Sequence, residues 1–339
     1  MANMKASELV RNHLNGFWKA QVVAAAASLG LADQMGDAPN DAAALAAMVQ
    51  ADAGSLYRLL RAMASLGLVS HEADDRFTIT DAGRCLKTGV EGSLRGMALH
   101  VGTMLSPAFC KLADSVRSGK PPEGIKFGPE GFAELNEVPD AAHIFNQSMV
   151  DGSRRVAELA NAAYDFGRFG TVMDVGGGYG AVLTGLLKHH PAMRGSVLDL
   201  EHAKQGAEAY FAAQGVADRA KFTTGSFFEP IAEDADCYVL KYIIHDWNDG
   251  YARQIMAQVG AAARRSNGTV VLIERVLPER IEARDDHAGA IQGDLTMMLW
   301  DGKERTAAEY RALFEGAGLS LTRIVPIGDG FDVIEGKPA

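Results

Sequence analysis

The C-terminal half of this sequence predicts an α/β domain with a doubly wound, mostly parallel sheet, and the N-terminal half predicts a helical domain. Two observations carry this prediction. From residue 171 onward, short apolar runs rich in β-branched residues alternate with helical segments, which is typical of parallel strands joined by helices. Before residue 91, Ala and Leu recur at helical spacing instead. We therefore expect domains over residues 1–90 and 166–339, joined by a helical connector over residues 91–165.

Composition indicates a globular protein that does not bind nucleic acid. Hydrophobic residues make up 47% and charged residues 22% of the 339 residues, which excludes a disordered or collagen-like chain. The net charge of −10 makes an overall electrostatic attraction to nucleic acid implausible. The longest apolar run, residues 22–32, is too short to cross a bilayer, and the first eleven residues lack a signal-peptide core. We expect no membrane association.

The cysteines favour a reducing compartment. Cys85, Cys110 and Cys237 form no close pair and no CxxC motif. A disulfide scaffold and a cysteine zinc site are therefore not expected. A cytoplasmic location follows as an expectation, because free thiols persist in that compartment.

The first 90 residues predict short helices followed by a β-hairpin. Leucines and Met63 between Leu56 and Leu66 follow the spacing of one buried helix face. Residues 68–70 and 76–80 then predict two strands around a polar turn, which together suggest a winged helix. Basic and acidic residues are equal in number, four each, from Ser55 to Arg84, whereas DNA readers carry a basic face. We expect packing or dimerisation in place of DNA binding.

The connector and the sheet are defined by apolar periodicity. Residues 91–165 read as helical apart from a Pro/Gly-rich loop at residues 118–129. Five parallel strands are predicted, at residues 171–175, 196–200, 221–224, 237–244 and 269–273. Two further strands, at residues 320–326 and 331–335, are joined by a link so short that they must form an antiparallel hairpin. That ending is not the usual arrangement of dinucleotide-dependent dehydrogenases.

A glycine-rich turn follows the first strand of the sheet and opens a helix. Glycines there allow a tight turn and a close approach of backbone to ligand. Gly176, Gly178 and Ala181 satisfy the dinucleotide fingerprint, and the same glycines with Gly180 suit S-adenosylmethionine equally well. Asp199 ends the second strand, where a carboxylate binds the ribose hydroxyls of either cofactor. Both cofactors, or a bare helix cap at Asp199, remain open on these residues alone.

Three further residues suggest acid–base chemistry. His245 lies where the fourth strand ends, which is the ligand-binding edge of an open α/β sheet, and imidazole titrates near neutral pH. Glu274 ends the neighbouring fifth strand and is placed to hold the imidazole in one tautomer. Glu304 precedes the last helix and on spacing alone is equally a solvated helix-start residue. No metal-binding motif, GxSxG elbow or Walker A sequence is present, and we expect no metal.

Five segments taken together resemble one enzyme family. They are DVGGG (174–178), LDL (198–200), LKYIIHDW (240–247), LIERVLP (272–278) and GKERT (302–306). In this order they resemble the caffeate-, isoflavone- and hydroxyindole-type O-methyltransferases and their bacterial small-molecule relatives. The resemblance implies a Rossmann-like methyltransferase domain, a winged-helix-like dimerisation domain and a homodimer formed through it. It also implies S-adenosylmethionine as methyl donor and S-adenosylhomocysteine as product.

The resemblance also assigns roles to residues. His245 matches the family's catalytic base, flanked by Glu274 and Glu304. The cofactor-binding positions are Gly176, Gly177, Gly178, Asp199, Ser226, Phe227, Lys241 and Trp247. Ser226 stands where the family has a carboxylate that contacts adenine, so that contact is in question.

The acceptor is less well defined by the sequence. The segment at residues 299–302 is shorter than in the plant enzymes, so their substrates do not transfer. The expected lining of the acceptor pocket is Phe145, Met149, Asp246, Met298 and Trp300. We expect methyl transfer to a phenolic hydroxyl of a small aromatic or polyketide-like molecule. The alternatives are an NAD(P)-dependent oxidoreductase and a protein that binds S-adenosylmethionine for different chemistry.

Overall fold

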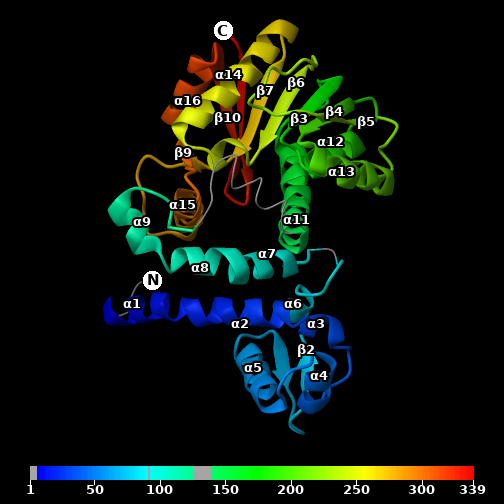
Figure 1. Ribbon diagram of the computed structural model, residues 1–339, viewed down its shortest axis with the longest axis vertical. Helices are drawn as coiled ribbons and strands as arrows, with labels where there is room; N and C mark the ends of the chain where they lie inside the picture. Colours follow the sequence, from blue (N-terminus) through cyan, green and yellow to red (C-terminus); the bar gives the residue numbers. More distant parts are fainter. Residues whose placement is uncertain (1–5, 91, 125–138) are drawn as a thin grey trace. The chain divides into compact units, whose positions relative to one another are not determined.

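The computed structural model describes residues 6–90, 92–124 and 139–339, without the side chains of residues 139–149, 151, 285 and 286. The chain folds as two compact units (Figure 1). Unit 1 comprises Met1–Cys110 and His143–Asp151, and unit 2 comprises Lys111–Ala142 and Gly152–Ala339. Within the described residues, none of the helices is long and apolar enough to cross a membrane.

Unit 1 is mainly helical, as the sequence predicts. Asp41 and Asp52 cap the helices α4 and α5 by accepting hydrogen bonds from the backbone N–H groups of Ala44 and Ser55. The predicted apolar helix face is confirmed in α5, which buries Leu56, Leu60 and Met63. The helical elements are α1 (Ala6–Leu14), α2 (Gly16–Ser28), α3 (Leu31–Gln34), α4 (Ala42–Met48), α5 (Ala53–Ser65), α6 (Asp81–Arg84), α7 (Arg95–His100), a π-helical turn (Val101–Leu105) and α8 (Ser106–Phe109).

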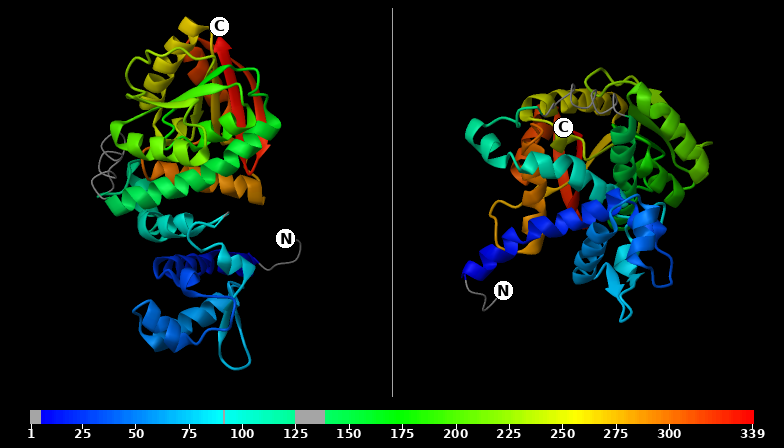
Figure 2. Two further views of the ribbon diagram at one scale, coloured as in Figure 1. Left: turned by 90° about the vertical axis from the view of Figure 1, so that its right-hand side faces the viewer. Right: turned by 60° about the horizontal axis from the view of Figure 1, so that its bottom comes forward.

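The predicted hairpin in unit 1 is also confirmed. Strands β1 (Val69–His71) and β2 (Phe77–Ile79) pair antiparallel and project beside α4 and α5 (Figure 2). Asn40 adds an isolated bridge to Phe77. Phe77 and Ile79 turn inward from β2 and join the core of the unit. The hairpin is thus anchored on the helices by its own apolar face.

The described part of the connector is mostly helical. Helix α9 (Leu112–Ser118) is followed by residues 119–124 without helix or strand, as the predicted loop requires, and the rest of that loop lies outside the described residues. Helix α11 (Pro139–Ala163) completes the connector. Cys85, Cys110 and Cys237 are free thiols. The cytoplasmic location stays a prediction.

Unit 2 contains a seven-stranded sheet of the order β10-β11-β7-β6-β3-β4-β5. The five strands β3 to β7 run parallel, and β11 pairs antiparallel with both β10 and β7. This confirms the parallel sheet with a terminal antiparallel hairpin. The strands are β3 (Thr171–Val175), β4 (Arg194–Asp199), β5 (Ala220–Thr224), β6 (Cys237–Lys241), β7 (Thr269–Glu274), β10 (Leu319–Gly328) and β11 (Phe331–Pro338).

Helices cover both faces of this sheet (Figures 1 and 2). Successive residues of β7 alternate between the two cores, as a strand buried on both faces requires. Val270 and Leu272 pack with α14 and α16, whereas Val271 and Ile273 pack with α11, α12 and α13. The remaining elements are α12 (Ala181–His189), α13 (Glu201–Gln214), α14 (Asp249–Ser266), α15 (Asp285–Met298), α16 (Ala307–Gly316), β8 (Val276–Leu277) and β9 (Arg305–Thr306).

One strand is shorter than predicted. The apolar run at residues 237–244 predicts a single strand, but β6 ends at Lys241. Tyr242 has a left-handed backbone conformation, with a φ of 55°, and a 3-10 turn follows at Ile244–Asp246. The backbone N–H groups of Ile243 and Ile244 donate to the carboxylate of Glu274, so they are not available to a strand. A side chain therefore ends β6 and redirects the chain.

A buried carboxylate ties the terminal hairpin to the rest of unit 2. Glu335 of β11 accepts hydrogen bonds from the Tyr164 hydroxyl, the Thr322 hydroxyl and the guanidinium groups of Arg168 and Arg323. Burial alone raises the pKa of this carboxyl, but these hydrogen bonds outweigh it and lower the pKa from 4.5 to about 2. The folded protein therefore favours the ionised form of Glu335.

Glu335→Gln is expected to lower the free energy of unfolding by about 2 kcal/mol at pH 7, because it leaves the two arginines without their carboxylate. The folded pKa is the lower one, so the stabilisation is present above the unfolded pKa of 4.5 and is lost as pH falls toward about 2. Urea unfolding should thus separate the variant from the wild type at pH 7 and less so at pH 3. Glu315→Gln, on the exposed side of α16, is the control. Equal stability of both variants at pH 7 would contradict this account.

Candidate active site

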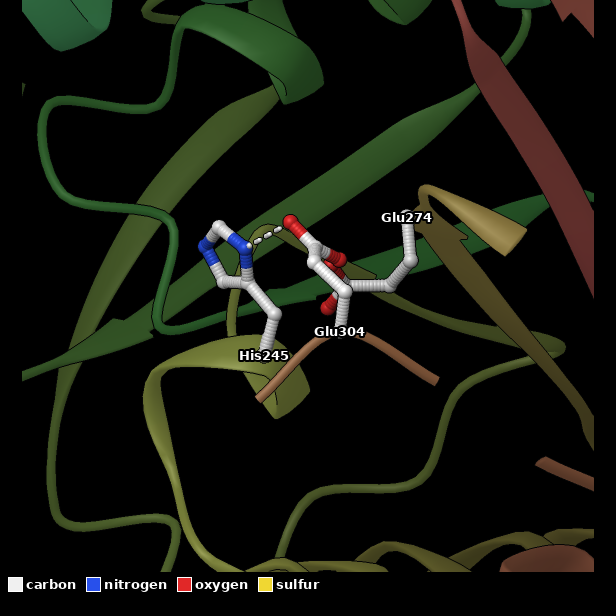
Figure 3. A group of neighbouring side chains, drawn as sticks. All are labelled: His245, Glu274 and Glu304. Atoms are coloured by element: carbon white, nitrogen blue, oxygen red, sulfur yellow. Dashed lines mark hydrogen bonds and ion pairs between the residues drawn. The ribbon is translucent and has the colours of Figure 1, made fainter. Parts of the chain in front are cut away.

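The candidate catalytic residues meet at the carboxyl edge of the sheet in unit 2. His245 lies in the 3-10 turn after β6, Glu274 is the last residue of β7, and Glu304 directly precedes β9. Figure 3 shows the three side chains converging from these separate segments. They are buried, with exposed fractions of 6%, 0% and 1%. The predicted meeting of His245 with both glutamates at this edge is what the fold produces.

The imidazole is held by Glu304. His245 Nδ1 lies 2.9 Å from Glu304 Oε1, and because an ionised carboxylate only accepts, Nδ1 is the donor (Figure 3). This contact leaves Nε2 as the nitrogen that can exchange a proton with a ligand. Nε2 lies 3.3 Å from Asp246 Oδ1. The imidazole is thus placed between two carboxylates.

The sequence-based role of Glu274 needs correction. Glu274 was expected to hold the imidazole, but its Oε1 accepts hydrogen bonds from the backbone N–H groups of Ile243 (3.0 Å) and Ile244 (2.9 Å). It therefore shapes the turn that carries His245, while Glu304 bonds the ring. The reading of Glu304 as a solvated helix-start residue is wrong, because the side chain is buried. Sequence spacing could not show this, since 59 residues separate His245 from Glu304.

The buried carboxylates favour protons in this cluster. Burial lowers the pKa of His245, but the charges of Asp246, Glu274 and Glu304 outweigh it and raise that pKa to about 9. Burial raises the pKa of Glu274 to about 7 and that of Asp246 to about 6. Geometry agrees, because a neutral imidazole has a single N–H and cannot donate to both carboxylates. Without ligands and near neutral pH, the cluster therefore holds at least one proton more than a neutral imidazole with ionised carboxylates would hold.

His245, Glu274 and Glu304 could also offer metal ligands, which sequence spacing did not reveal. One ligand atom from each lies within 4.8 Å of the others. However, His245 Nδ1 is bonded to Glu304, and Glu274 Oε1 is bonded to two backbone N–H groups. A metal ion bound through His245 Nδ1 or Glu274 Oε1 would have to displace these contacts, whereas the second carboxylate oxygens, Glu274 Oε2 and Glu304 Oε2, are buried without a hydrogen-bond partner among the described residues. We interpret the cluster as a base with carboxylate neighbours.

Sequence reasoning missed Tyr242. Its ring stacks on the His245 imidazole, with centroids 4.2 Å apart and planes inclined by 16°. Arg275 Nε donates to the Tyr242 hydroxyl over 2.7 Å, and Phe331 packs against the same ring. Burial raises the pKa of this phenol well above its usual range. The stacking depends on the left-handed backbone of Tyr242, which no sequence signal announced.

The glycine-rich turn lies between β3 and α12 at the same sheet edge. Gly176 and Gly178 have φ values of 71° and 55°, which only glycine adopts readily. A Cβ on Gly177 would come within 2.5 Å of Asp174 Cγ, so that position also requires glycine. A Cβ on Gly178 would meet nothing within 4 Å, which shows that the backbone here borders open space. The turn can therefore present backbone to a ligand.

Asp199 is joined directly to this turn. Its Oδ2 accepts from the backbone N–H of Gly178 and its Oδ1 from that of Leu200, each over 2.7 Å. Each oxygen keeps a further lone pair, so the half-buried carboxylate can also accept from the two hydroxyls of a ribose. The reading of Asp199 as a bare helix cap is not supported, because the N-cap of α13 is Leu200 and no side chain caps that helix. These residues fit the adenosine part of S-adenosylmethionine.

Lys241 lies deep in the site. Its Nζ donates to Ser153 Oγ over 3.1 Å and lies 4.5 Å from the centroid of the Tyr242 ring. Burial lowers the pKa of this ammonium group to about 8, against the opposing effect of Glu274 and Asp246. Lys241, the last residue of β6, is therefore held by its hydrogen bond to Ser153 and its contact with the Tyr242 ring. Whether it also contacts the cofactor stays a prediction.

The aromatic residues near the glycine turn differ in exposure, since Trp247 is buried and Phe227 is half-buried. Trp247 is only 3% exposed and packs edge-on against Phe228, with centroids 4.9 Å apart. Phe227 is half-buried and lies next to the glycine turn, 3.2 Å from a Cβ placed on Gly176. Ser226 Oγ accepts from the N–H of Phe228 over 3.2 Å. Phe227 thus offers more surface to an adenine than Trp247, whose contact with the cofactor stays a prediction.

The expected acceptor residues are placed in part. Asp246 lies beside His245, and its side chain is partly exposed. Met298 ends α15, Trp300 follows it, and both are half-buried. Phe145 and Met149 lie in α11, but their side chains are outside the described part of the structure. The lining of the acceptor pocket stays a prediction.

Comparison with known proteins decides the family. Residues 109–320 match the model of the O-methyltransferase domain, and residues 11–89 match that of the O-methyltransferase dimerisation domain. The chain belongs to the O-methyltransferase family. The resemblance drawn from the five motifs is confirmed, as is the Rossmann-like methyltransferase fold with a helical N-terminal dimerisation domain.

Relatives of this O-methyltransferase cover nearly all of it. The phenazine O-methyltransferase PhzM of Lysobacter antibioticus is 32% identical, with 98% of this chain and 96% of the relative aligned. The crystal structure of LaPhzM matches with a TM-score of 0.91 at 32% identity, covering 99% of this chain and 100% of the other. NcsB1 from neocarzinostatin biosynthesis, crystallised with S-adenosylmethionine and 2-hydroxy-5-methyl naphthoic acid, gives 0.79 at 30% identity over 94% and 96%.

The cofactor follows from the family. Similar structures hold S-adenosylmethionine or S-adenosylhomocysteine, among them NcsB1 and human N-acetylserotonin methyltransferase. S-adenosylmethionine is therefore the methyl donor of this O-methyltransferase. The NAD(P)-dependent oxidoreductase and the non-methylating protein, which the glycine turn and Asp199 left open, are both set aside.

Proposed function

We propose that this O-methyltransferase methylates a phenolic hydroxyl of a small aromatic or polyketide-like molecule, with His245 as general base. The observation that carries the proposal is the buried His245–Glu304 pair at the carboxyl edge of β6, in the same unit as the glycine turn. Names of relatives support the acceptor class. They include a 3-amino-4-hydroxybenzoate 4-O-methyltransferase of Streptomyces cremeus and a 2,7-dihydroxy-5-methyl-1-naphthoate 7-O-methyltransferase of Streptomyces carzinostaticus.

The chemistry needs a base more than an acid. S-adenosylmethionine, when bound, supplies an electrophilic methyl group on a positively charged sulfur. His245 Nε2 takes the hydroxyl proton as the oxygen forms its bond to the methyl carbon and the carbon–sulfur bond breaks. Glu304 accepts from Nδ1 throughout and stabilises the imidazolium that forms. A phenol is about three pKa units too weak an acid at pH 7, or about 4 kcal/mol, which general-base catalysis and proximity can supply.

The proposed cofactor site uses the edge of β3, β4 and β6. Gly176, Gly177 and Gly178 would face the methionine end and the ribose, and Asp199 would accept from both ribose hydroxyls. Phe227, Ser226, Lys241 and Trp247 complete the proposed set. Ser226 is neutral where relatives of the plant type have a carboxylate, so adenine recognition would rest more on stacking against Phe227. The proposed acceptor lining is that of the sequence analysis: Phe145, Met149, Asp246, Met298 and Trp300.

An acceptor panel tests the proposed reaction. The protein is incubated with S-adenosylmethionine carrying a radioactive methyl group and with 3-amino-4-hydroxybenzoate, 2,7-dihydroxy-5-methyl-1-naphthoate or N-acetylserotonin. We expect labelled product from at least one acceptor and none from its hydroxyl-free analogue. Label that appears equally on the hydroxyl-free analogue would contradict O-methylation. Absence of label from all three, in protein that calorimetry shows to bind S-adenosylmethionine, would contradict the acceptor class.

The pKa of His245 sets the expected pH dependence. The imidazolium persists up to about pH 9, and the base must be neutral to accept a proton. kcat/KM is therefore expected to rise about tenfold per pH unit between about pH 7 and 8.5 and to level off above about pH 9. The rising limb reports the ionisation of His245 in the free enzyme. Two acceptors whose hydroxyl pKa values differ should therefore give the same rising limb. A limb that moves with the acceptor, or a flat profile, would contradict this assignment.

We also propose that the N-terminal unit forms a homodimer. Residues 6–20 are all exposed, and they include the apolar side chains Leu9, Val10, Leu14, Phe17 and Trp18. The dimerisation-domain match begins within this segment, at residue 11. Light scattering after gel filtration should give twice the chain mass, and Leu14→Asp with Phe17→Asp should reduce it to one chain. A monomeric wild type would contradict the proposal. We also propose the division into residues 1–90, 91–165 and 166–339. The match of the dimerisation-domain model to residues 11–89 supports its first boundary.

A further inference from the structure

A buried guanidinium bonds the backbone of the turn that carries the candidate base. Arg305 opens β9, follows Glu304 in sequence, and is fully buried. All five of its N–H groups are used, since Nη1 and Nη2 each make two hydrogen bonds and Nε makes one. The acceptors are Ile244 O (2.8 Å) and Lys303 O (3.1 Å) for Nη1, Trp247 O (2.8 Å) and Asp249 Oδ1 (3.0 Å) for Nη2, and Asp249 Oδ1 (3.3 Å) for Nε.

These acceptors lie on the two segments that carry the catalytic pair. Ile244 and Trp247 stand on either side of His245 and Asp246 in the turn after β6. Lys303 stands immediately before Glu304, and its N–H donates to the carbonyl of His245 over 2.7 Å. The guanidinium thus joins the turn that presents the imidazole to the segment that presents the carboxylate.

The fork shape of the guanidinium is essential to this arrangement. Its planar group reaches three carbonyls and a carboxylate at once, whereas a lysine ammonium is a single point with three donors. Lysine at this position would keep the positive charge but leave buried carbonyl oxygens without partners. A substitution by lysine therefore removes the hydrogen-bond geometry of the guanidinium and retains its positive charge. It separates the effect of the geometry from the effect of the charge.

We propose that Arg305 is a positioning residue that holds His245 in register with Glu304. The proposal rests on the proposed role of His245 as general base. In this account Arg305 does not contact the reacting atoms and acts only through the imidazole. Misplacement of a catalytic group by about 1 Å can lower a rate about a hundredfold, so loss of this register should be visible in turnover.

Arg305→Lys is the main test, with Arg265→Lys, at a partly exposed arginine, as the control for the same substitution elsewhere in unit 2. Arg265 also bonds backbone carbonyls and a carboxylate, those of Ile231, Ala232 and Asp234, but it lies near the opposite end of the sheet. We expect Arg305→Lys to lower kcat about 30- to 100-fold with the Kd of S-adenosylmethionine changed less than about twofold. Arg265→Lys should leave both unchanged. A folded Arg305→Lys protein with wild-type kcat would overturn the proposal.

A second readout needs no acceptor. In protein labelled with ¹³C-histidine, the signal absent from His245→Ala identifies the imidazole of His245, whose titration is followed by NMR. In Arg305→Lys we expect its pKa to fall by about one unit toward the ordinary value, because the imidazole loses its register with Glu304 while the local charge is kept. A merely structural arginine would destabilise the fold and leave this titration unchanged, which would contradict the proposal.

The double variant separates this inference from the proposed function. If Arg305 acts through His245, Arg305→Lys adds no further loss of kcat in the His245→Ala background. An equal loss in both backgrounds would refute a positioning role. Wild-type turnover in His245→Ala alone would instead refute the proposed base. If Arg305→Lys does not fold, Asp249→Asn takes its place, because that carboxylate is 48% exposed, and the same pKa shift of His245 in smaller measure is expected.

Discussion

His245→Ala is expected to lower kcat about 10²- to 10⁴-fold, the contribution of a well-placed general base. The Kd of S-adenosylmethionine should stay nearly unchanged, because the proposed cofactor contacts come from the glycine turn and Asp199. The imidazole is buried, with Nδ1 fixed by Glu304, so no other side chain in the described cluster can present a neutral nitrogen at that place. Steady-state methyl transfer together with calorimetric titration measures both quantities.

The control for this variant is His190→Ala. His190 is half-buried and bonds the Asn161 side chain at the end of α12, far along the chain from the candidate site. It should keep wild-type turnover. His245→Asn tests whether a hydrogen-bonding side chain of similar size suffices. Full activity of His245→Ala would remove the base from the mechanism and leave proximity as the source of catalysis.

Asp199→Asn is expected to weaken S-adenosylmethionine binding about 10- to 100-fold, because hydrogen bonds to a charged group contribute about 1.5–3 kcal/mol. The amide loses one acceptor oxygen. Its NH₂ group would also face the backbone N–H of Gly178 or Leu200, both of which donate to the carboxylate at 2.7 Å. The glycine turn should therefore lose order as well as a ribose contact. Calorimetry with S-adenosylmethionine and S-adenosylhomocysteine measures the effect.

Asp236→Asn is the matched control for Asp199→Asn. Asp236 likewise accepts from two backbone N–H groups, those of Gly170 and Thr171, but at the start of β3 and so at the other end of that strand. It should leave the affinity for both sulfur compounds unchanged. If the two variants weaken binding to the same extent, the effect comes from general destabilisation of the sheet, and the ribose contact loses its support.

The centre of the sheet was predictable because β3, β6 and β7 are buried on both faces. Apolar β-branched runs of this kind are read directly from the sequence, and β3 has the predicted bounds. The short link before β11 fixed the antiparallel hairpin in the same way. The end of β6 was not predictable, because a long-range contact from Glu274 takes the N–H groups of Ile243 and Ile244 out of the strand.

The candidate site was predictable in its members and less so in their contacts. Motif order brought His245, Glu274 and Glu304 together, but which carboxylate bonds the ring depends on the fold of the segment before β9. Tyr242 and Arg305 were missed for a related reason. The role of Tyr242 depends on a left-handed φ, and that of Arg305 depends on carbonyl groups, which carry no sequence signal at all.

The central claim is that His245 removes the acceptor's proton, and one measurement tests it most directly. The ratio of kcat between wild type and His245→Ala is determined over a series of phenols of one shape and decreasing hydroxyl pKa. Because a phenol that is already ionised needs no base, the account predicts a ratio that is large for weakly acidic phenols and falls toward one for the most acidic. A ratio that stays constant across the series would contradict it.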